Sequence, residues 1–213
     1  MSKVRLIGDI HGSWGHYKLN ILEGCESSIQ VGDFGFGFNS VADERMLDWQ
    51  NDNPRHQFIR GNHDNPAICE ESVSYIRDGS VLLDHKAMCI GGAWSIDYAV
   101  RREGKSWWPD EECSHEQFDN FTQTYLQDKP RVMITHEAPL QIPRWHQFVD
   151  GDIQTTRTGL RLGQMWHQHK PELWVFGHWH KSFDETVEGT RFICLNIDEW
   201  VDLDWDTLEV TYS

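Results

Sequence analysis

Side chains that bind metal ions recur along this chain, each time directly after an apolar run. Asp9 and His11 follow the run over residues 4–7, and Asp33 follows the run over residues 28–31. In a turning segment Asp9 and His11 can point the same way, so that a carboxylate oxygen and an imidazole nitrogen reach one divalent cation. One such pair is weak evidence, since an Asp-x-His after a strand is more often a turn with an incidental histidine. A metal site is favoured because the same pattern, an apolar run followed by a metal-binding side chain, recurs along the chain.

Three more clusters have the same form. They are Asn62-His63-Asp64 after residues 57–60, His136 after residues 131–135, and His178 with His180 after residues 173–176. Oxygen ligands mixed with imidazoles suit a pair of divalent transition ions that share one carboxylate and a hydroxide. Two such ions, about 3.5 to 4 Å apart, acidify bound water and hold a tetrahedral anion. This is chemistry for hydrolysing phosphate esters.

The apolar runs alternate with predicted helices, and this alternation decides where the clusters meet. Helices are expected over residues 14–23, 41–49, 114–126 and 156–170, the third opened by a capping box of Ser114 and Gln117. Strands are expected at each run above and over residues 86–90, and the remainder of the chain after His180, with runs such as residues 191–197, predicts strands that close a second sheet. Open α/β sheets bind ligands at the carboxyl edge of their strands, so we expect Asp33 beside Asp9.

Length and composition favour one domain over residues 1–213, with a long loop insertion at about residues 91–113. The net charge of −15 argues against a broad nucleic-acid or membrane surface. The five cysteines form no C-x-x-C and are expected to be reduced, with Cys89 and Cys194 in buried strands. Neither a signal-peptide apolar core nor a membrane-length apolar run occurs, so we expect a cytoplasmic protein. The oligomeric state stays open.

The ordered motifs resemble the calcineurin-like metallophosphoesterase superfamily, and in particular its small bacterial and phage members. The resemblance spans residues 4 to about 197 and rests on Asp9-x-His11, Gly32-Asp33, Gly61-Asn62-His63-Asp64, His136 and Gly177-His178-x-His180. It implies an α/β fold with four layers (α/β/β/α), in which two mixed sheets form a sandwich flanked by helices.

The same resemblance implies a role for each ligand. Asp9, His11 and His180 would hold the first metal, Asn62, His136 and His178 the second, and Asp33 would bridge the two. The cofactors would be two divalent ions, Mn²⁺ first, with Fe, Zn, Ni or Mg as alternatives. His63 corresponds to the histidine that contacts the phosphate and protonates the leaving oxygen, and Asp64 would orient it.

One departure from the superfamily concerns the phosphate-binding arginine. In the serine/threonine phosphatase branch an arginine follows the second motif, but here Asp33 continues with Phe34-Gly35-Phe36-Gly37. Protein phosphatase activity of that type is therefore not expected. Arg60, Arg101 or Arg102 could supply the missing cation.

Other polar and aromatic residues have simpler interpretations. His167 and His169 fall within a predicted helix, where positions two apart face different ways, and are expected on the surface. Trp107 and Trp108 either stack on a nucleobase or pin the long loop, and we favour the second role. Residues 110–112, Asp-Glu-Glu, are expected to be a solvated helix entry.

The leading functional hypothesis is a dinuclear metal-dependent phosphoesterase. It would act on small or nucleotide-like phosphate mono- or diesters, with the metal-bridging hydroxide as nucleophile. A nuclease that uses the same centre is one alternative, although the acidic chain offers no basic stripe for a polymer. A non-catalytic binding scaffold on this fold is the other, and the complete ligand set argues against it.

Overall fold

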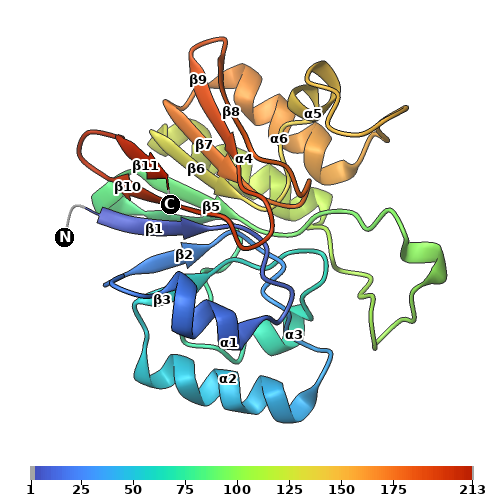
Figure 1. Ribbon diagram of the computed structural model, residues 1–213. Helices are drawn as coiled ribbons and strands as arrows, with labels where there is room; N and C mark the ends of the chain where they lie inside the picture. The colour runs from blue at the N-terminus through green and yellow to red at the C-terminus, as the bar shows by residue number, and fades with distance from the viewer. Residues whose placement is uncertain (1–2, 213) are drawn as a thin grey trace.

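The computed structural model describes residues 3–212. Within them two β-sheets pack face to face and helices cover both outer faces, as Figure 1 shows. The expected α/β fold of two mixed sheets flanked by helices is confirmed. No described helix is both long enough and apolar enough to cross a membrane.

Each sheet combines parallel and antiparallel pairs. From edge to edge the first sheet runs β11 (Val210–Tyr212), β10 (Trp200–Asp204), β1 (Lys3–Ile7), β2 (Ser28–Gln30) and β3 (His56–Phe58). The second runs β4 (Ser80–Leu82), β5 (Ala87–Ile90), β6 (Val132–Thr135), β7 (Leu173–Phe176), β9 (Thr190–Cys194) and β8 (Phe183–Val187).

Helices lie on the outer faces and in the connections. They are α1 (Trp14–His16) with the π-helical turn η1 (Tyr17–Ile21), α2 (Ser40–Asp52), α3 (Pro66–Cys69), α4 (His115–Asp128), α5 (Gln141–Trp145) and α6 (Arg157–Gln168), with the 3-10 turns η2 (Leu83–His85) and η3 (Tyr98–Val100). In Figure 1 the helices α1 to α3 flank the first sheet, and α4 to α6 flank the second.

The alternation of side chains along each strand produces the four layers. Val132 and Ile134 of β6 pack between the two sheets, while Met133 packs against the helices outside the second sheet. On β1, Leu6 faces the other sheet and Ile7 joins the cluster under α1 and α2. Apolar residues at consecutive positions therefore fill two different cores, as expected for strands buried on both faces.

The parallel pairs bring the carboxyl ends of the central strands to one edge of the sandwich. β1, β2 and β3 pair in parallel, and so do β5, β6 and β7. The segments that follow β1 and β2 therefore lie side by side, which confirms the expected proximity of Asp9 and Asp33.

The C-terminal strands divide between the sheets. β8 and β9 complete the second sheet as predicted, but β10 and β11 extend the first sheet, so that part of the prediction is wrong. The reason is the register of β10, which runs antiparallel to β1 with Val201 opposite Leu6. Val201 and Leu203 thereby enter the core between the sheets.

The capping box that opens α4 is present as predicted. Ser114 Oγ accepts a hydrogen bond from the Gln117 amide at 3.1 Å, and Gln117 Oε1 accepts one from the Ser114 amide at 2.7 Å. The helix expected over residues 14–23 is replaced by α1 and the π-helical turn η1. The cysteines are free, and Cys89 and Cys194 lie in buried strands, which agrees with the prediction.

The long loop after β5 leaves the body of the protein and projects to the right in Figure 1. Its return end is fixed by the buried Arg60, whose Nε lies 2.7 Å from Asp78 Oδ2 and whose Nη1 donates to the carbonyls of Asp110 and Glu111. Arg60 is therefore a structural residue with all its donors directed away from the ligand clusters. Trp108 is buried in the same region, which fits the predicted role of pinning the loop.

Candidate metal centre

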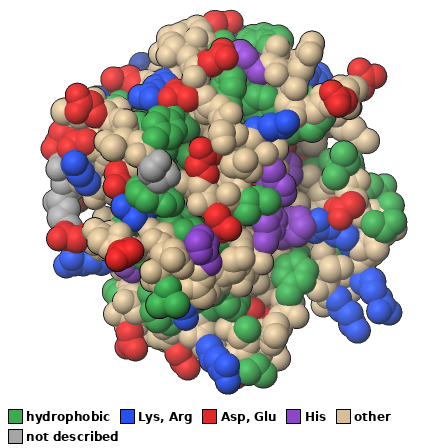
Figure 2. Space-filling model, in the orientation of Figure 1, with side chains coloured by type: hydrophobic (Ala, Val, Ile, Leu, Met, Phe, Trp, Pro, Cys, Tyr) green, Lys and Arg blue, Asp and Glu red, His purple; other side chains and the backbone are tan. Residues whose placement is uncertain are grey.

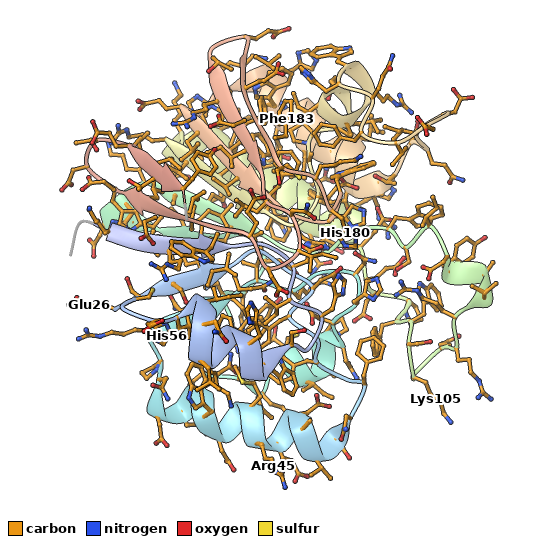
Figure 3. All side chains as sticks on the ribbon, in the orientation of Figure 1. Glu26, Arg45, His56, Lys105, His180 and Phe183 are labelled. Carbon is orange, nitrogen blue, oxygen red and sulfur yellow. The ribbon has the colours of Figure 1, made fainter. Side chains whose placement is uncertain are left out.

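The predicted metal ligands converge at the carboxyl edge of the two sheets. Asp9 and His11 follow β1, Asp33 follows β2, Asn62 and His63 follow β3, His136 follows β6, and His178 and His180 follow β7. Figure 2 shows the histidines of this edge as one patch right of centre on the surface, and Figure 3 places His180 where the long loop leaves the body. Residues up to 171 positions apart are thus brought to one place.

One group of donors consists of Asp9, His11, Asp33 and His180, whose ligand atoms all lie within 4.8 Å of one another. His180 Nε2 is 3.0 Å from Asp9 Oδ2, and 3.2 Å from His11 Nε2. The Asp9 carboxylate raises the pKa of His180 through this hydrogen bond, and partial burial of the ring opposes the shift. Two imidazole nitrogens and two carboxylates this close together could hold a metal ion.

A second group consists of Asn62, His136 and His178. Asn62 Oδ1 lies 3.1 Å from His136 Nε2 and 3.0 Å from His178 Nδ1. Burial, and then the nearby His136, lower the pKa of His178 to about 3, so its ring is neutral and can act as a ligand.

Asp33 lies between the two groups. Its Oδ1 is 3.3 Å from His136 Nε2, and its Oδ2 is 3.9 Å from His11 Nε2. Burial acts to raise the pKa of Asp33, but the neighbouring His136 outweighs it and holds the pKa well below its usual range. Asp33 is therefore an ionised carboxylate with one oxygen toward each group.

The backbone bends sharply at these ligands. His11, Asp33, His178 and His180 all have positive φ, between 43° and 67°, a conformation that non-glycine residues adopt only at a cost. Gly61, which precedes Asn62, leaves room for a neighbouring ligand, since a Cβ at Gly61 would overlap the Asp33 carboxylate. Strained ligand positions of this kind persist where the surrounding structure forces them, and they are typical of functional sites.

One histidine and one side-chain amide of the second group are held in orientation by residues behind them. His136 Nδ1 lies 2.9 Å from the Val31 carbonyl and donates to it, which leaves Nε2 free to bind a cation. The Asn62 side-chain amide donates to Ser95 Oγ at 3.0 Å, so its oxygen faces the centre. Ser95 Oγ in turn donates to Glu111 Oε2 at 2.6 Å.

Sequence reasoning missed this supporting pair. The expectation that residues 110–112 are solvated is wrong for Glu111, which is buried with 3% of its surface exposed. Burial raises the pKa of Glu111, and the hydrogen bonds from Ser95 oppose that shift. Nothing local in an Asp-Glu-Glu run distinguishes the buried member, because its partner comes from the start of the same long loop.

His63 lies on the open side of Asp33, with its Nε2 4.0 Å from Asp33 Oδ2. That nitrogen also accepts a hydrogen bond from Nη2 of Arg101 at 2.6 Å. Burial lowers the pKa of His63, the Asp33 carboxylate opposes this, and the Arg101 charge lowers it further. Of the three candidate arginines, Arg101 reaches the centre, Arg60 is tied to Asp78, and Arg102 is exposed.

Asp64 has a different environment from the expected one. Its Oδ1 accepts hydrogen bonds from the Gly35 and Phe36 amides at 2.6 and 3.1 Å, and its Oδ2 from the Gly61 and Phe34 amides at 2.7 and 3.0 Å. Burial, and then the Asp33 charge, raise the pKa of Asp64, while these amides oppose the shift. The expectation that Asp64 orients His63 does not match these contacts, which instead fix the turn that carries Asp33.

A cavity of about 320 Å³ opens beside the two groups, with Asp33, Asn62, His63, His178 and His180 on one side. Trp94 and Trp179 line it, whereas Trp107 and Trp108 are not among its lining residues. Among the other histidines, His167 is exposed as predicted. His169 is instead half-buried, with its Nε2 2.9 Å from the Pro130 carbonyl.

Comparison with solved structures finds matches to proteins that bear phosphoesterase names. A Staphylococcus aureus protein provisionally assigned as a 5'-nucleotidase is 16% identical with a TM-score of 0.55, over 99% of this chain and 52% of that one. This chain thus spans about half of its length. A novel archaeal phosphodiesterase is 13% identical over 99% and 98% of the two chains, with a TM-score of 0.46. The phosphopantetheinyl hydrolase of Mycobacterium tuberculosis is 14% identical over 92% and 91%, with a TM-score of 0.47.

No family model and no curated protein sequence matches this chain. At 16% identity, the similarity to the Staphylococcus aureus structure shows a shared fold, that of two mixed sheets flanked by helices.

Proposed function

We propose that this protein is a phosphoesterase that uses two divalent metal ions to hydrolyse small phosphate mono- or diesters. The observation that carries the proposal is the position of Asp33, a buried ionised carboxylate with one oxygen toward His11 and the other toward His136. A carboxylate shared by two groups of oxygen and imidazole donors is what a dinuclear centre requires.

The donor set fits the metal pair that the resemblance implies. Asp9, His11 and His180 would hold one ion, and Asn62, His136 and His178 the other, with Asp33 shared between them. Bound divalent ions at these positions would acidify water and stabilise negative charge on phosphate oxygens. Manganese is the first candidate from the resemblance, and the carboxylate and amide oxygens suit it, while the four imidazoles suit iron, zinc or nickel as well.

Arg101 and His63 would serve the reacting ester directly. In hydrolysis the oxygen of water bonds to phosphorus, the ester P–O bond breaks, and the leaving oxygen takes up a proton. Arg101 now donates to His63 Nε2, but a phosphate oxygen is a stronger acceptor for a guanidinium. When Arg101 turns to the phosphate, His63 Nε2 becomes free to carry the proton for the leaving oxygen.

The experiment that tests this function compares p-nitrophenyl phosphate with bis-p-nitrophenyl phosphate. Protein stripped of metal with a chelator is reloaded with manganese, nickel, zinc or magnesium, and p-nitrophenol release is followed. We expect turnover only in the reloaded protein, and the ratio of the two rates to distinguish monoesterase from diesterase activity.

Two variants and one control complete the test. Asp33→Asn and His136→Ala are expected to abolish turnover while leaving the far-ultraviolet circular dichroism unchanged. His167→Ala, at an exposed position on α6, is the matched control and keeps full activity. Undiminished activity in metal-stripped protein would refute the proposal.

A further inference from the structure

The cavity beside the metal centre extends well beyond the room that a phosphoryl group needs. One wall is formed by residues 94–101 of the loop after β5, and the other by residues 149–156 between α5 and α6. In Figure 1 both segments project from the same side of the body. Because the cavity lies directly beside the metal centre, the leaving group of a bound phosphate ester would enter it.

Apolar side chains line both walls and the floor between them. They are Trp94, Ile96, Leu140, Val149, Ile153 and Trp179. Ile96 is 80% exposed and Val149 is 42% exposed, although each lines the cavity. Apolar surface left in water at the mouth of a site favours a ligand that covers it. Two tryptophans offer flat faces for a planar ring.

The charge of the walls limits the ligand further. Among the described lining residues Arg101 alone carries a fixed positive charge, and its Nε already lies 2.6 Å from Asp97 Oδ1. Asp97 and Asp152 contribute carboxyl groups to the same walls. The proposed metal ions and Arg101 would be engaged by the phosphate, so a second negative group on the ligand would meet Asp97 and Asp152 without a further cation to receive it.

The size of the cavity gives an upper limit. Small-molecule sites usually occupy about 300 to 1,000 Å³, so a cavity of about 320 Å³ is at the lower end of that range. It has room for a phosphoryl group and one ring system, with or without a linking sugar.

From these features we propose that the cavity is a leaving-group subsite, and that it selects phosphate esters whose leaving group carries one planar aromatic or heteroaromatic ring and no negative charge. This inference rests on the proposed phosphoesterase function and adds the class of substrate. The ring can belong to a simple aryl compound or to a nucleobase, since both present a flat apolar face.

The first experiment compares esters that differ only in the ring. Benzyl phosphate is compared with ethyl phosphate, and adenosine 5'-monophosphate with ribose 5-phosphate, by phosphate release from manganese-loaded protein. Each pair loses an alkyl alcohol, so the intrinsic reactivity within a pair is similar. We expect the ring to raise kcat/KM roughly ten- to hundredfold, the gain from burying one ring. The pair with the larger gain identifies the source of the ring.

A charged analogue tests the acidic walls. A benzyl phosphate with a carboxylate at the para position keeps the ring and adds one negative charge. Its kcat/KM is expected to fall at least fivefold below that of benzyl phosphate. An equal or higher value would overturn the charge selectivity.

Two variants test which wall of the cavity produces the preference for a ring. Ile96→Asp and Val149→Asp change exposed side chains of opposite walls, so the fold is preserved, and each should lower the benzyl-to-ethyl ratio at least fivefold. Val41→Asp, an exposed valine on α2 away from the cavity, is the matched control and leaves the ratio unchanged.

Binding of benzylphosphonate, which cannot be hydrolysed, supplies a readout that does not depend on turnover. Quenching of tryptophan fluorescence by benzylphosphonate should occur at a concentration at least tenfold lower than quenching by ethylphosphonate. Turnover of all esters with ratios near one, together with equal phosphonate affinities, would overturn the subsite and leave the phosphoesterase proposal standing. Absence of turnover for every ester would instead overturn the proposed function, and the ring inference would fall with it unless benzylphosphonate still bound more tightly.

Discussion

Replacement of Asp64 by asparagine separates two roles that this residue could have. The carboxylate accepts four main-chain hydrogen bonds, two on each oxygen, from Phe34, Gly35, Phe36 and Gly61. Asparagine has the same size but only one acceptor oxygen. Its NH₂ group would face two amide N–H groups that lose their acceptor.

The loss of folding stability follows from the number of buried N–H groups left without an acceptor. A buried N–H without an acceptor costs about 1 to 3 kcal/mol, so two of them cost about 2 to 6 kcal/mol. For a chain of 213 residues each kcal/mol lowers the melting temperature by about 2 to 4 °C. We therefore expect Asp64→Asn to lower the melting temperature by roughly 4 to 24 °C.

The assay is thermal unfolding by circular dichroism, followed by the pH dependence of kcat/KM at a temperature where the variant is folded. If Asp64 supports the turn around Asp33, the melting temperature falls and the pH profile keeps its shape. Asp48→Asn, at an exposed position on α2, is the matched control and should change stability by less than about 0.5 kcal/mol. An unchanged melting temperature with a displaced pH profile would refute this reasoning and restore the orienting role toward His63.

Three further predictions concern the centre and its neighbours. Arg101→Ala should lower kcat/KM by roughly 10²-fold and weaken inhibition by inorganic phosphate, while Arg102→Ala, at an exposed position, should change both by less than twofold. Equal effects of the two substitutions would contradict the assignment of Arg101 to phosphate binding. Manganese at a hundred times its dissociation constant should stabilise the fold by about 2.7 kcal/mol, seen as a higher melting temperature that a chelator reverses, and an unchanged temperature would argue against binding. Ser95→Ala should weaken binding of one of two manganese ions about 10- to 100-fold in calorimetric titration, because the Asn62 side chain loses its hydrogen-bond acceptor. Unchanged affinities would show that Ser95 is not needed to orient Asn62 for metal binding.

The strand-end motifs could be found without the structure because each one is local. An apolar run is followed within a few residues by a carboxylate, an asparagine or a histidine, in most cases after a glycine, and parallel strands bring such ends to one edge. Consecutive apolar residues in β6 and β7 likewise indicate strands buried on both faces, but the four layers were expected only from the family resemblance.

The supporting contacts could not be found in this way because their partners are distant in sequence. Glu111 is buried only because the long loop folds back and brings it to Ser95. β10 joins the first sheet because its apolar side chains match β1 in register, a choice that no local pattern reveals. Asp64 and His63 are neighbours in the chain, yet their side chains serve different partners.

The sequence by itself therefore determined which side chains could form the metal centre and where along the chain the strands that carry them lie, because both depend on short-range patterns. Only the tertiary structure decided how these side chains are held and what surrounds them. It placed Arg101 rather than Arg60 at His63, and it put Trp94 and Trp179 on the walls of one cavity. These outcomes depend on the path of two loops, and a loop's path is set by packing against distant residues and not by its own propensities.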